Sequence, residues 1–127
     1  MKVINTTKAP AAIGPYSQAI AANGLLFTSG QIPVDPATGL VVEGGIESQA
    51  RMVMENLKAV LVEADVDFSA VVKTTCFISS MDDFAAFNTI YSQYFTSDAK
   101  PARSCVAVKN LPKNVLCEVE AIAVLGA

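Results

Sequence analysis

The spacing of apolar residues along the chain constrains its fold more than any other feature. In residues 46–64, apolar side chains recur every three or four positions, which is typical of an amphipathic helix with one buried face. A second helix is predicted to begin at Ser80, because Ser80-Met81-Asp82-Asp83 resembles a capping box with Asp in place of Glu. Its apolar face is predicted to carry five aromatic side chains, Phe84, Phe87, Tyr91, Tyr94 and Phe95. Between the two helices, Val71–Ile78 is rich in Val, Thr and Phe, which predicts a strand.

Further strands are predicted on either side of these helices. Asn23-Gly24 is a strong signal for a two-residue hairpin turn, so segments 16–22 and 25–29 are expected to pair. The remaining predicted strands are a short one at Val3-Ile4 and two C-terminal ones at 103–108 and 116–125. This order predicts an α+β fold, in which one mixed sheet of about six strands carries both helices on one face. The other face is then free to meet neighbouring subunits.

The composition favours one domain with a subunit interface. A chain of 127 residues can bury one hydrophobic core but is too short for two, so we expect a single domain over residues 1–127. Hydrophobic residues make up 52% of the chain, which is high for this size. We expect the surplus to lie in a closed, symmetric interface between subunits.

Charge and hydropathy indicate which partners to expect. The net charge is −3 and no basic run occurs, which argues against nucleic-acid binding. The N-terminal segment turns polar after two apolar residues, unlike a signal peptide, and no apolar run approaches the roughly 20 residues of a membrane span. We therefore expect a cytoplasmic protein with neither nucleic acid nor membrane as a partner.

The residue types also limit the chemistry. The chain has no His, and its three cysteines, Cys76, Cys105 and Cys117, lack any C-x-x-C spacing. A disulfide framework, most transition-metal sites and nucleophile systems that use His are therefore excluded. Catalysis has to use Arg, Glu, Tyr, Asn, Cys or backbone groups.

Charged residues interrupt both C-terminal strands. Arg103 and Cys105 are two positions apart and share a face of the first strand, as do Glu118 and Glu120 on the second. Arg103 either pairs with one of these glutamates across the strands or binds an anionic substrate, and the two are not exclusive. A guanidinium fits a carboxylate, and a carboxylate can position or deprotonate a water.

Four other residues are candidates for a substrate pocket, each with a simpler explanation. Tyr16 could present its hydroxyl at a pocket mouth or only cap the core, and Gly30 could admit a ligand close to the backbone or only allow a bend. Asn88 could bond a substrate or face solvent, and Cys105 could be a small buried hydrophobe.

Taken together, five segments carry a resemblance. They are Ile13-Gly14-Pro15-Tyr16-Ser17-Gln18-Ala19, Thr28-Ser29-Gly30-Gln31-Ile32-Pro33, Lys73-Thr74-Thr75-Cys76-Phe77, Pro101-Ala102-Arg103-Ser104-Cys105-Val106, and Leu111-Pro112 with Glu118-Val119-Glu120-Ala121-Ile122-Ala123-Val124. The chain closely resembles the RidA family (YjgF/YER057c/UK114), the reactive-intermediate imine deaminases.

The resemblance implies a chorismate-mutase-like α+β fold and a homotrimer with sites in the clefts between subunits. It also implies hydrolysis, without a cofactor or metal, of 2-imino acids, the tautomers of enamines such as 2-aminoacrylate and 2-aminocrotonate, to 2-oxo acids and ammonia. By position, Arg103 resembles the arginine that binds the substrate carboxylate, and Glu118 resembles the glutamate that holds the attacking water. Tyr16, Gly30, Asn88 and Cys105 match the remaining substrate-binding positions, with Gly30 and Cys105 acting through backbone groups.

The chain departs from the expected pattern in one place, and two other functions remain open. After the first helix, Asp65 stands where a left-handed Gly is usual, which concerns helix stability and not activity.

A non-catalytic module that binds small carboxylates and regulates a partner would need Arg103 but not Glu118. The other open function is that of a ribonuclease or translation inhibitor, which salt-sensitive RNA binding would support.

Overall fold

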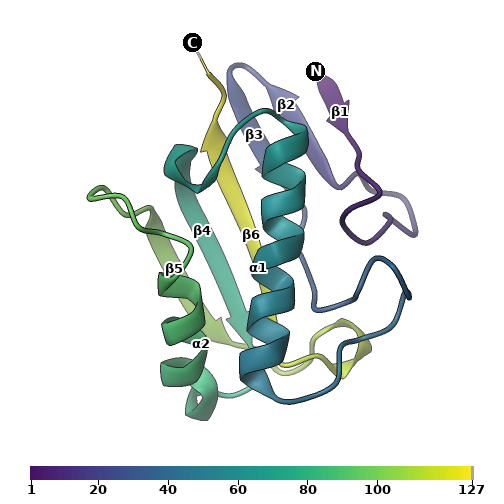
Figure 1. Ribbon diagram of the computed structural model, residues 1–127, viewed down its shortest axis with the longest axis vertical. Helices are drawn as coiled ribbons and strands as arrows, with labels where there is room; N and C mark the ends of the chain where they lie inside the picture. Colours follow the sequence, from purple (N-terminus) through teal and green to yellow (C-terminus); the bar gives the residue numbers. More distant parts are fainter. Residues whose placement is uncertain (127) are drawn as a thin grey trace.

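The protein folds as one mixed sheet with two helices, seen in a computed structural model that describes residues 1–126. Six strands lie in the order β1-β2-β3-β6-β4-β5, and all neighbours are antiparallel except β4 and β5. The strands are β1 (Lys2–Ile4), β2 (Ala19–Ala22), β3 (Leu25–Thr28), β4 (Val71–Ile78), β5 (Ala102–Ala107) and β6 (Cys117–Val124). The helices α1 (Ile46–Glu63) and α2 (Phe84–Ser92) both cover the same face of the sheet (Figure 1). The predicted α+β architecture is therefore confirmed.

The predicted hairpin joins β2 and β3. Asn23 and Gly24 both have positive φ angles, 52° and 73°, as a two-residue turn between strands of this twist requires. The prediction that the first of these strands begins at residue 16 is wrong, because it begins at Ala19. Just before it, Gln18 bonds the N-terminal loop instead, accepting from Thr6 N at 2.7 Å and donating to Pro10 O at 2.8 Å.

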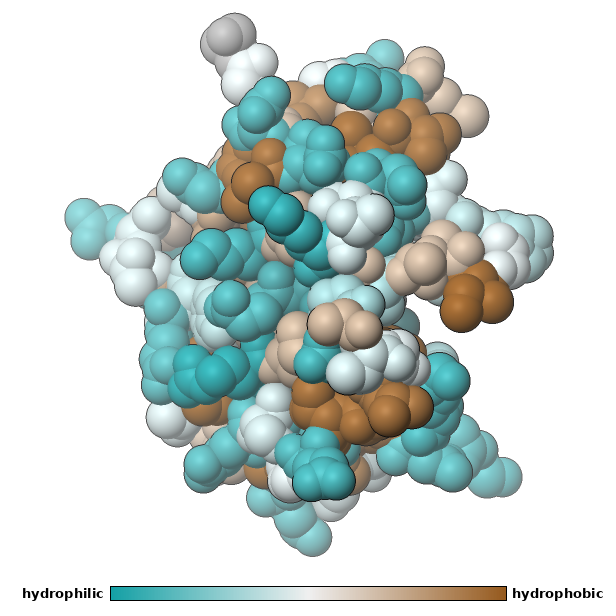
Figure 2. Space-filling view, turned by 45° about the vertical axis from the view of Figure 1, so that its right-hand side comes forward, coloured by the Kyte–Doolittle hydropathy of each residue, from teal (hydrophilic) through white to brown (hydrophobic). Residues whose placement is uncertain are grey.

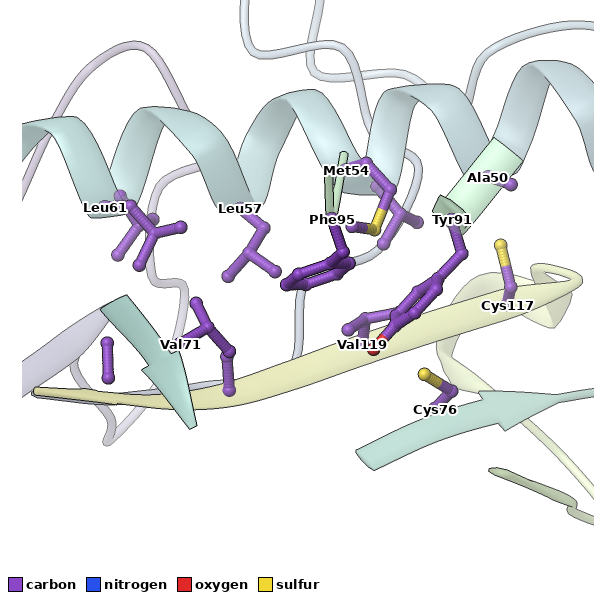
Figure 3. Packing of buried hydrophobic residues seen from close by; sticks show 14 of the residues in the cluster. Ala50, Met54, Leu57, Leu61, Val71, Cys76, Tyr91, Phe95, Cys117 and Val119 are labelled. Carbon is purple, nitrogen blue, oxygen red and sulfur yellow. The ribbon is translucent and has the colours of Figure 1, made fainter. Parts of the chain in front are cut away.

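Helix α1 packs its apolar face against the sheet and contributes more residues to the core than any other element (Figure 3). Its fully buried apolar residues are Ala50, Val53, Met54, Leu57, Val60 and Leu61. One polar residue, Asn56, is also fully buried in this helix. It donates hydrogen bonds to Ile32 O at 3.0 Å and Val34 O at 2.9 Å, and so ties the long loop after β3 to the core.

Helix α1 ends in a left-handed residue, as the sequence suggested. Asp65 has a φ of 59°, and Val66 N donates to Leu61 O at 3.0 Å, the bond that closes a Schellman motif. A residue with a Cβ pays a steric cost in this conformation.

Asp65→Gly is therefore expected to raise the free energy of unfolding by about 0.5–1 kcal/mol, because Gly adopts the left-handed region without that cost. Thermal and denaturant unfolding measure the change. Asp65→Ala is the matched control, since it keeps the Cβ and should give no gain. A loss of stability in Asp65→Gly would show that the Asp65 side chain makes a compensating interaction.

Helix α2 begins one turn later than the capping signal predicted. Ser80 Oγ accepts from Asp82 N at 3.1 Å, but this bond caps a short 3₁₀ turn, Met81–Asp83, from which α2 continues. The predicted aromatic face is confirmed in part. Phe87, Tyr91 and Phe95 are buried, and Phe95 lies beyond the end of the helix.

The two sides of the sheet differ in what covers them. The helix side and the β1–β2 edge carry hydrophilic side chains interspersed with separate apolar patches (Figure 2). On the face opposite the helices, Phe27, Val106 and Val124 remain 42%, 45% and 46% exposed. Among residues 1–126, one face of the sheet thus has no covering layer, as predicted. Within residues 1–126, no helix is long and apolar enough to cross a membrane.

Candidate functional site

The strand order separates the two charged groups that the sequence analysis placed together. Strand β4 lies between β5 and β6, with Arg103 opposite Thr74 and Glu118 opposite Phe77. Because side chains alternate along a strand, Arg103 and Cys105 lie on the helix-covered face and the two glutamates lie on the open face. The suggestion that Arg103 pairs with a glutamate across the strands is therefore wrong within one chain.

Arg103 is held against helix α2. Its Nη1 donates to Asn88 Oδ1 at 2.7 Å, and its guanidinium carbon lies 4.8 Å from the centre of the Tyr91 ring. The Phe84 ring is 5.6 Å away. A cleft of about 410 Å³ opens here, lined by Asn88, Tyr91, Ser92, Phe95, Lys100, Pro101 and Arg103. No acidic residue lines it among those described, so it suits an anion.

Cys105 lies two residues further along β5 but does not line this cleft in the described chain. Burial raises the pKa of its thiol, and the nearby Arg103 charge opposes that rise only in part. The thiol is therefore mainly protonated at neutral pH and is a poor nucleophile.

Glu118 lies in a second, larger cleft on the other side of β6. This cleft has a volume of about 830 Å³, and Tyr16, Gly30, Gln31, Glu118 and Glu120 are among its lining residues. Burial raises the pKa of the Glu118 carboxyl, and the neighbouring charge of Glu120 raises it further. A carboxyl group shifted in this direction is a stronger base than an ordinary carboxylate.

Gly30 makes room for the Glu118 side chain. A Cβ at position 30 would lie 2.7 Å from Glu118 Cδ and would overlap the carboxylate. Position 30 is fixed beside Glu118 by the adjacent pair Gln31 and Val119, whose backbones exchange hydrogen bonds of 2.8 and 3.1 Å. Gly30 therefore has a steric role at the carboxylate, in addition to the two alternatives from the sequence, close approach of a ligand or a bend at the strand end.

The six predicted site residues thus fall into three places. Tyr16, Gly30 and Glu118 share the larger cleft, where Tyr16 is 54% exposed. Asn88 and Arg103 share the smaller cleft, and Cys105 lines neither. The sequence analysis missed Gln18 and Asn56, which hold two of the loops around the larger cleft. Asn56 did leave a signal, because it is a polar residue within the apolar spacing of α1.

Comparisons with known proteins give the chain clear relatives. A family model described as Endoribonuclease L-PSP matches residues 6–125. A RutC family protein of Synechocystis is 57% identical over 98% of this chain and 97% of its own. A Lactococcus lactis protein provisionally named the regulator AldR is 54% identical over 97% of each chain.

A third relative is Escherichia coli TdcF, provisionally named a reactive intermediate deaminase, which is 46% identical over 99% of this chain and 98% of its own. A crystal structure of TdcF with bound serine superposes with a TM-score of 0.93 at 45% identity, and the match covers 99% of this chain and 100% of that one.

Proposed function

The chain belongs to the YjgF/RidA family, which the Endoribonuclease L-PSP model describes, and on that premise we propose that it hydrolyses reactive 2-imino acids to 2-oxo acids and ammonia. The proposed substrates include the imine tautomers of 2-aminoacrylate and 2-aminocrotonate. The observation that carries the proposal is the half-buried Glu118 carboxyl, with its raised pKa, facing Gly30 in a cleft wide enough for a small acid. The relative named as a reactive intermediate deaminase supports the same chemistry.

The reaction needs little beyond orientation and proton transfer. A protonated imine carbon is already electrophilic, so Glu118 takes a proton from water as the water oxygen bonds to that carbon. The C=N π electrons move to nitrogen and give a tetrahedral aminoalcohol. Glu118 then returns the proton to nitrogen and takes the hydroxyl proton in turn, so that the C–N bond breaks, the C=O bond of the 2-oxo acid forms and ammonia leaves. Glu118 passes this last proton to the ammonia, which is released as ammonium, and is again a carboxylate. Tyr16 and the backbone at Gly30 contact the substrate from the Glu118 cleft. Cys105 lines neither cleft within one chain, and a contact of its backbone with the substrate is part of the proposal.

The substrate carboxylate is bound by Arg103. One of its five N–H donors is used by Asn88, which leaves the others for a carboxylate. Such a charge-assisted contact contributes about 1.5–3 kcal/mol. The substrate is a single small acid, so Arg103 and Glu118 have to reach it together.

We place the complete site between subunits of a homotrimer, because Arg103 and Glu118 lie on opposite faces of one sheet. Strand β5 is the last strand of the sheet, so its residues lie at an edge that can reach a neighbour. The neighbour's open face carries Glu118 and exposed Phe27 and Val106, which suit an apolar interface. Each site then takes Arg103 and Asn88 from one subunit and Tyr16, Gly30 and Glu118 from the next.

A coupled assay tests the activity. A threonine dehydratase generates 2-aminocrotonate, and the decay of its ultraviolet absorbance is followed with and without the protein, alongside 2-oxobutanoate release. The wild type should speed both, and Arg103→Ala should not. Equal acceleration by both proteins would refute the assigned site, and no acceleration by either would refute the activity.

The rate should depend on pH in a way that distinguishes Glu118 from Glu120. A general base works only when ionised, so the rate should fall as the pH drops through the raised pKa of Glu118. Because the Glu120 charge contributes to that raised pKa, Glu120→Gln should shift this fall to lower pH and leave the maximum rate within about threefold. The measurement is kcat against pH for both proteins. Abolished activity in Glu120→Gln would identify Glu120 as the base instead.

The runner-up function is a non-catalytic module that binds small carboxylates and regulates a partner. The Lactococcus relative named as a regulator favours it. It needs the Arg103 cleft but not Glu118, so full biological effect and normal ligand binding in Glu118→Gln would support it. The family model's name refers to an endoribonuclease. We do not propose that activity, because the net charge of −3 does not suit phosphate binding; salt-sensitive RNA binding would overturn this choice.

A further inference from the structure

The guanidinium of Arg103 rests on a side chain that is itself anchored. The ring of Tyr91 lies 4.8 Å from the guanidinium carbon, and its hydroxyl forms a 2.8 Å hydrogen bond with Thr74 Oγ1. Thr74 is fully buried and Tyr91 is 7% exposed, so water does not compete for this bond. Figure 3 shows the Tyr91 ring pointing from α2 towards the sheet.

The register of the sheet places this anchor directly beside the arginine. Thr74 on β4 is the residue opposite Arg103 on β5, so both side chains rise from the same face at the same level. By bonding the Tyr91 hydroxyl, Thr74 therefore fixes the Tyr91 ring next to the Arg103 side chain. Phe87 and Phe95 pack around the ring, with centroids 5.9 and 4.6 Å away, and restrict it further.

A free arginine side chain has many rotamers, and a binding site needs one of them. Asn88 supplies one hydrogen bond to the guanidinium, and one bond leaves rotation about its own axis. A ring face stacked on the guanidinium removes that freedom and adds a cation–π attraction. An arginine that is already oriented before binding loses less conformational entropy when the ligand binds, so the free-energy cost of binding is smaller.

We infer that Tyr91, anchored by Thr74, is a positioning residue that orients Arg103 for the substrate carboxylate. This inference rests on the proposed function, since it concerns the same arginine. It adds two residues to the site that carry no charge and need not touch the substrate's reacting atoms.

The experiment compares two ligands on four proteins by calorimetry. The ligands are 2-oxobutanoate and its neutral amide, which differ only in the group that Arg103 would bind. The proteins are the wild type, Tyr91→Phe, the double variant Tyr91→Phe with Thr74→Val, and Phe87→Leu. Phe87 is the matched control, because it is a fully buried neighbour of Tyr91 for which no contact with Arg103 is seen among the described residues.

Tyr91→Phe keeps the ring but loses its anchor, so affinity for the acid should fall about threefold to tenfold and affinity for the amide should not change. In the enzyme assay KM should rise by the same factor while kcat stays within about twofold. Tyr91→Phe also leaves the buried Thr74 hydroxyl without its Tyr91 partner, so that only the weakly bonding Cys76 thiol remains beside it, and Thr74→Val removes that hydroxyl. The double variant should therefore regain stability without regaining affinity for the acid. Phe87→Leu should lower stability and leave the ratio of the two affinities as in the wild type.

Two results would refute the positioning role while sparing the proposed function. In the first, the wild type binds the acid more tightly than the amide, and Tyr91→Phe has the same ratio of acid affinity to amide affinity as the wild type. In the second, Tyr91→Phe and Phe87→Leu lose affinity for both ligands to the same extent, which would show that Tyr91 acts only by packing in the core. If the wild type itself binds acid and amide equally, the failure lies with Arg103 and with the proposed function.

Discussion

Glu118→Gln is expected to slow imine hydrolysis by about 10²–10⁴-fold, because the amide keeps the shape of the side chain but cannot accept a proton from water. Binding should change little, since we propose that Arg103 and not Glu118 binds the substrate carboxylate. The variant is also expected to unfold at a higher temperature at neutral pH. Burial and Glu120 raise the pKa of Glu118, so the folded chain holds an ionised carboxylate less well than the unfolded chain does, and the amide removes that cost.

The measurements are kcat, the affinity for 2-oxobutanoate, and thermal unfolding at two pH values. The contribution of Glu118 to stability is present below its ordinary pKa and is lost as the pH rises through the raised one, so the difference in melting temperature should shrink at acid pH. Glu120→Gln is the control for charge removal alone. If Glu118→Gln retains full kcat, Glu118 is not the base.

Arg103→Ala is expected to weaken binding of the 2-oxo acid about 10- to 150-fold, which corresponds to the loss of a charge-assisted contact. The loss should be specific to the carboxylate, so the neutral amide should bind almost as well as to the wild type. Arg103→Lys keeps the charge but not the two-pronged geometry, and should lie between the two proteins. KM and calorimetric affinity measure the effect.

Truncating Arg103 also removes the partner of Asn88 and the cation above Tyr91, so folding has to be checked. Asn88→Ala is the matched control for the lost hydrogen bond, and it should weaken acid binding much less than Arg103→Ala. Acid affinity retained in Arg103→Ala would show that another cation, such as Lys100 in the same cleft, binds the carboxylate.

Local signals in the sequence were sufficient to predict most of the elements. Asn23-Gly24 fixes its own turn, because both residues tolerate positive φ, and the spacing in α1 follows from one buried helix face. The last two strands begin and end within one residue of the predicted bounds. The start of β2 was less predictable, since a distant loop competes for the side chain of Gln18.

The relation between Arg103 and Glu118 could not be read from local pattern. Strands that follow one another along the chain usually pair, and β5 and β6 do not. Helix α2 carries the chain across to a parallel β5 at the sheet edge, and β6 then returns between β3 and β4. Alternation within each strand predicted which residues share a face, but only the register showed that the two faces are opposite.

The anchors of the site were also hidden from sequence patterns. Asn56 and Thr74 act through one or two hydrogen bonds each, and Gln18 through four, to residues elsewhere along the chain. The partner atoms are backbone N–H and C=O groups or a single hydroxyl, which leave no motif. The one such role that the sequence could indicate is that of Asn56, a polar residue among the regularly spaced apolar residues of α1.

The central claim is that each site joins Arg103 of one subunit to Glu118 of the next, and mixing two impaired variants at a substrate concentration well below KM tests it directly. Arg103→Ala and Glu118→Gln are unfolded together, refolded as one mixture, and assayed against each protein refolded alone. In a randomly mixed trimer about one quarter of the interfaces carry both intact residues, so about one quarter of the wild-type activity should return. Activity that stays at the level of the separate variants, in a mixture shown to contain mixed trimers, would contradict the account.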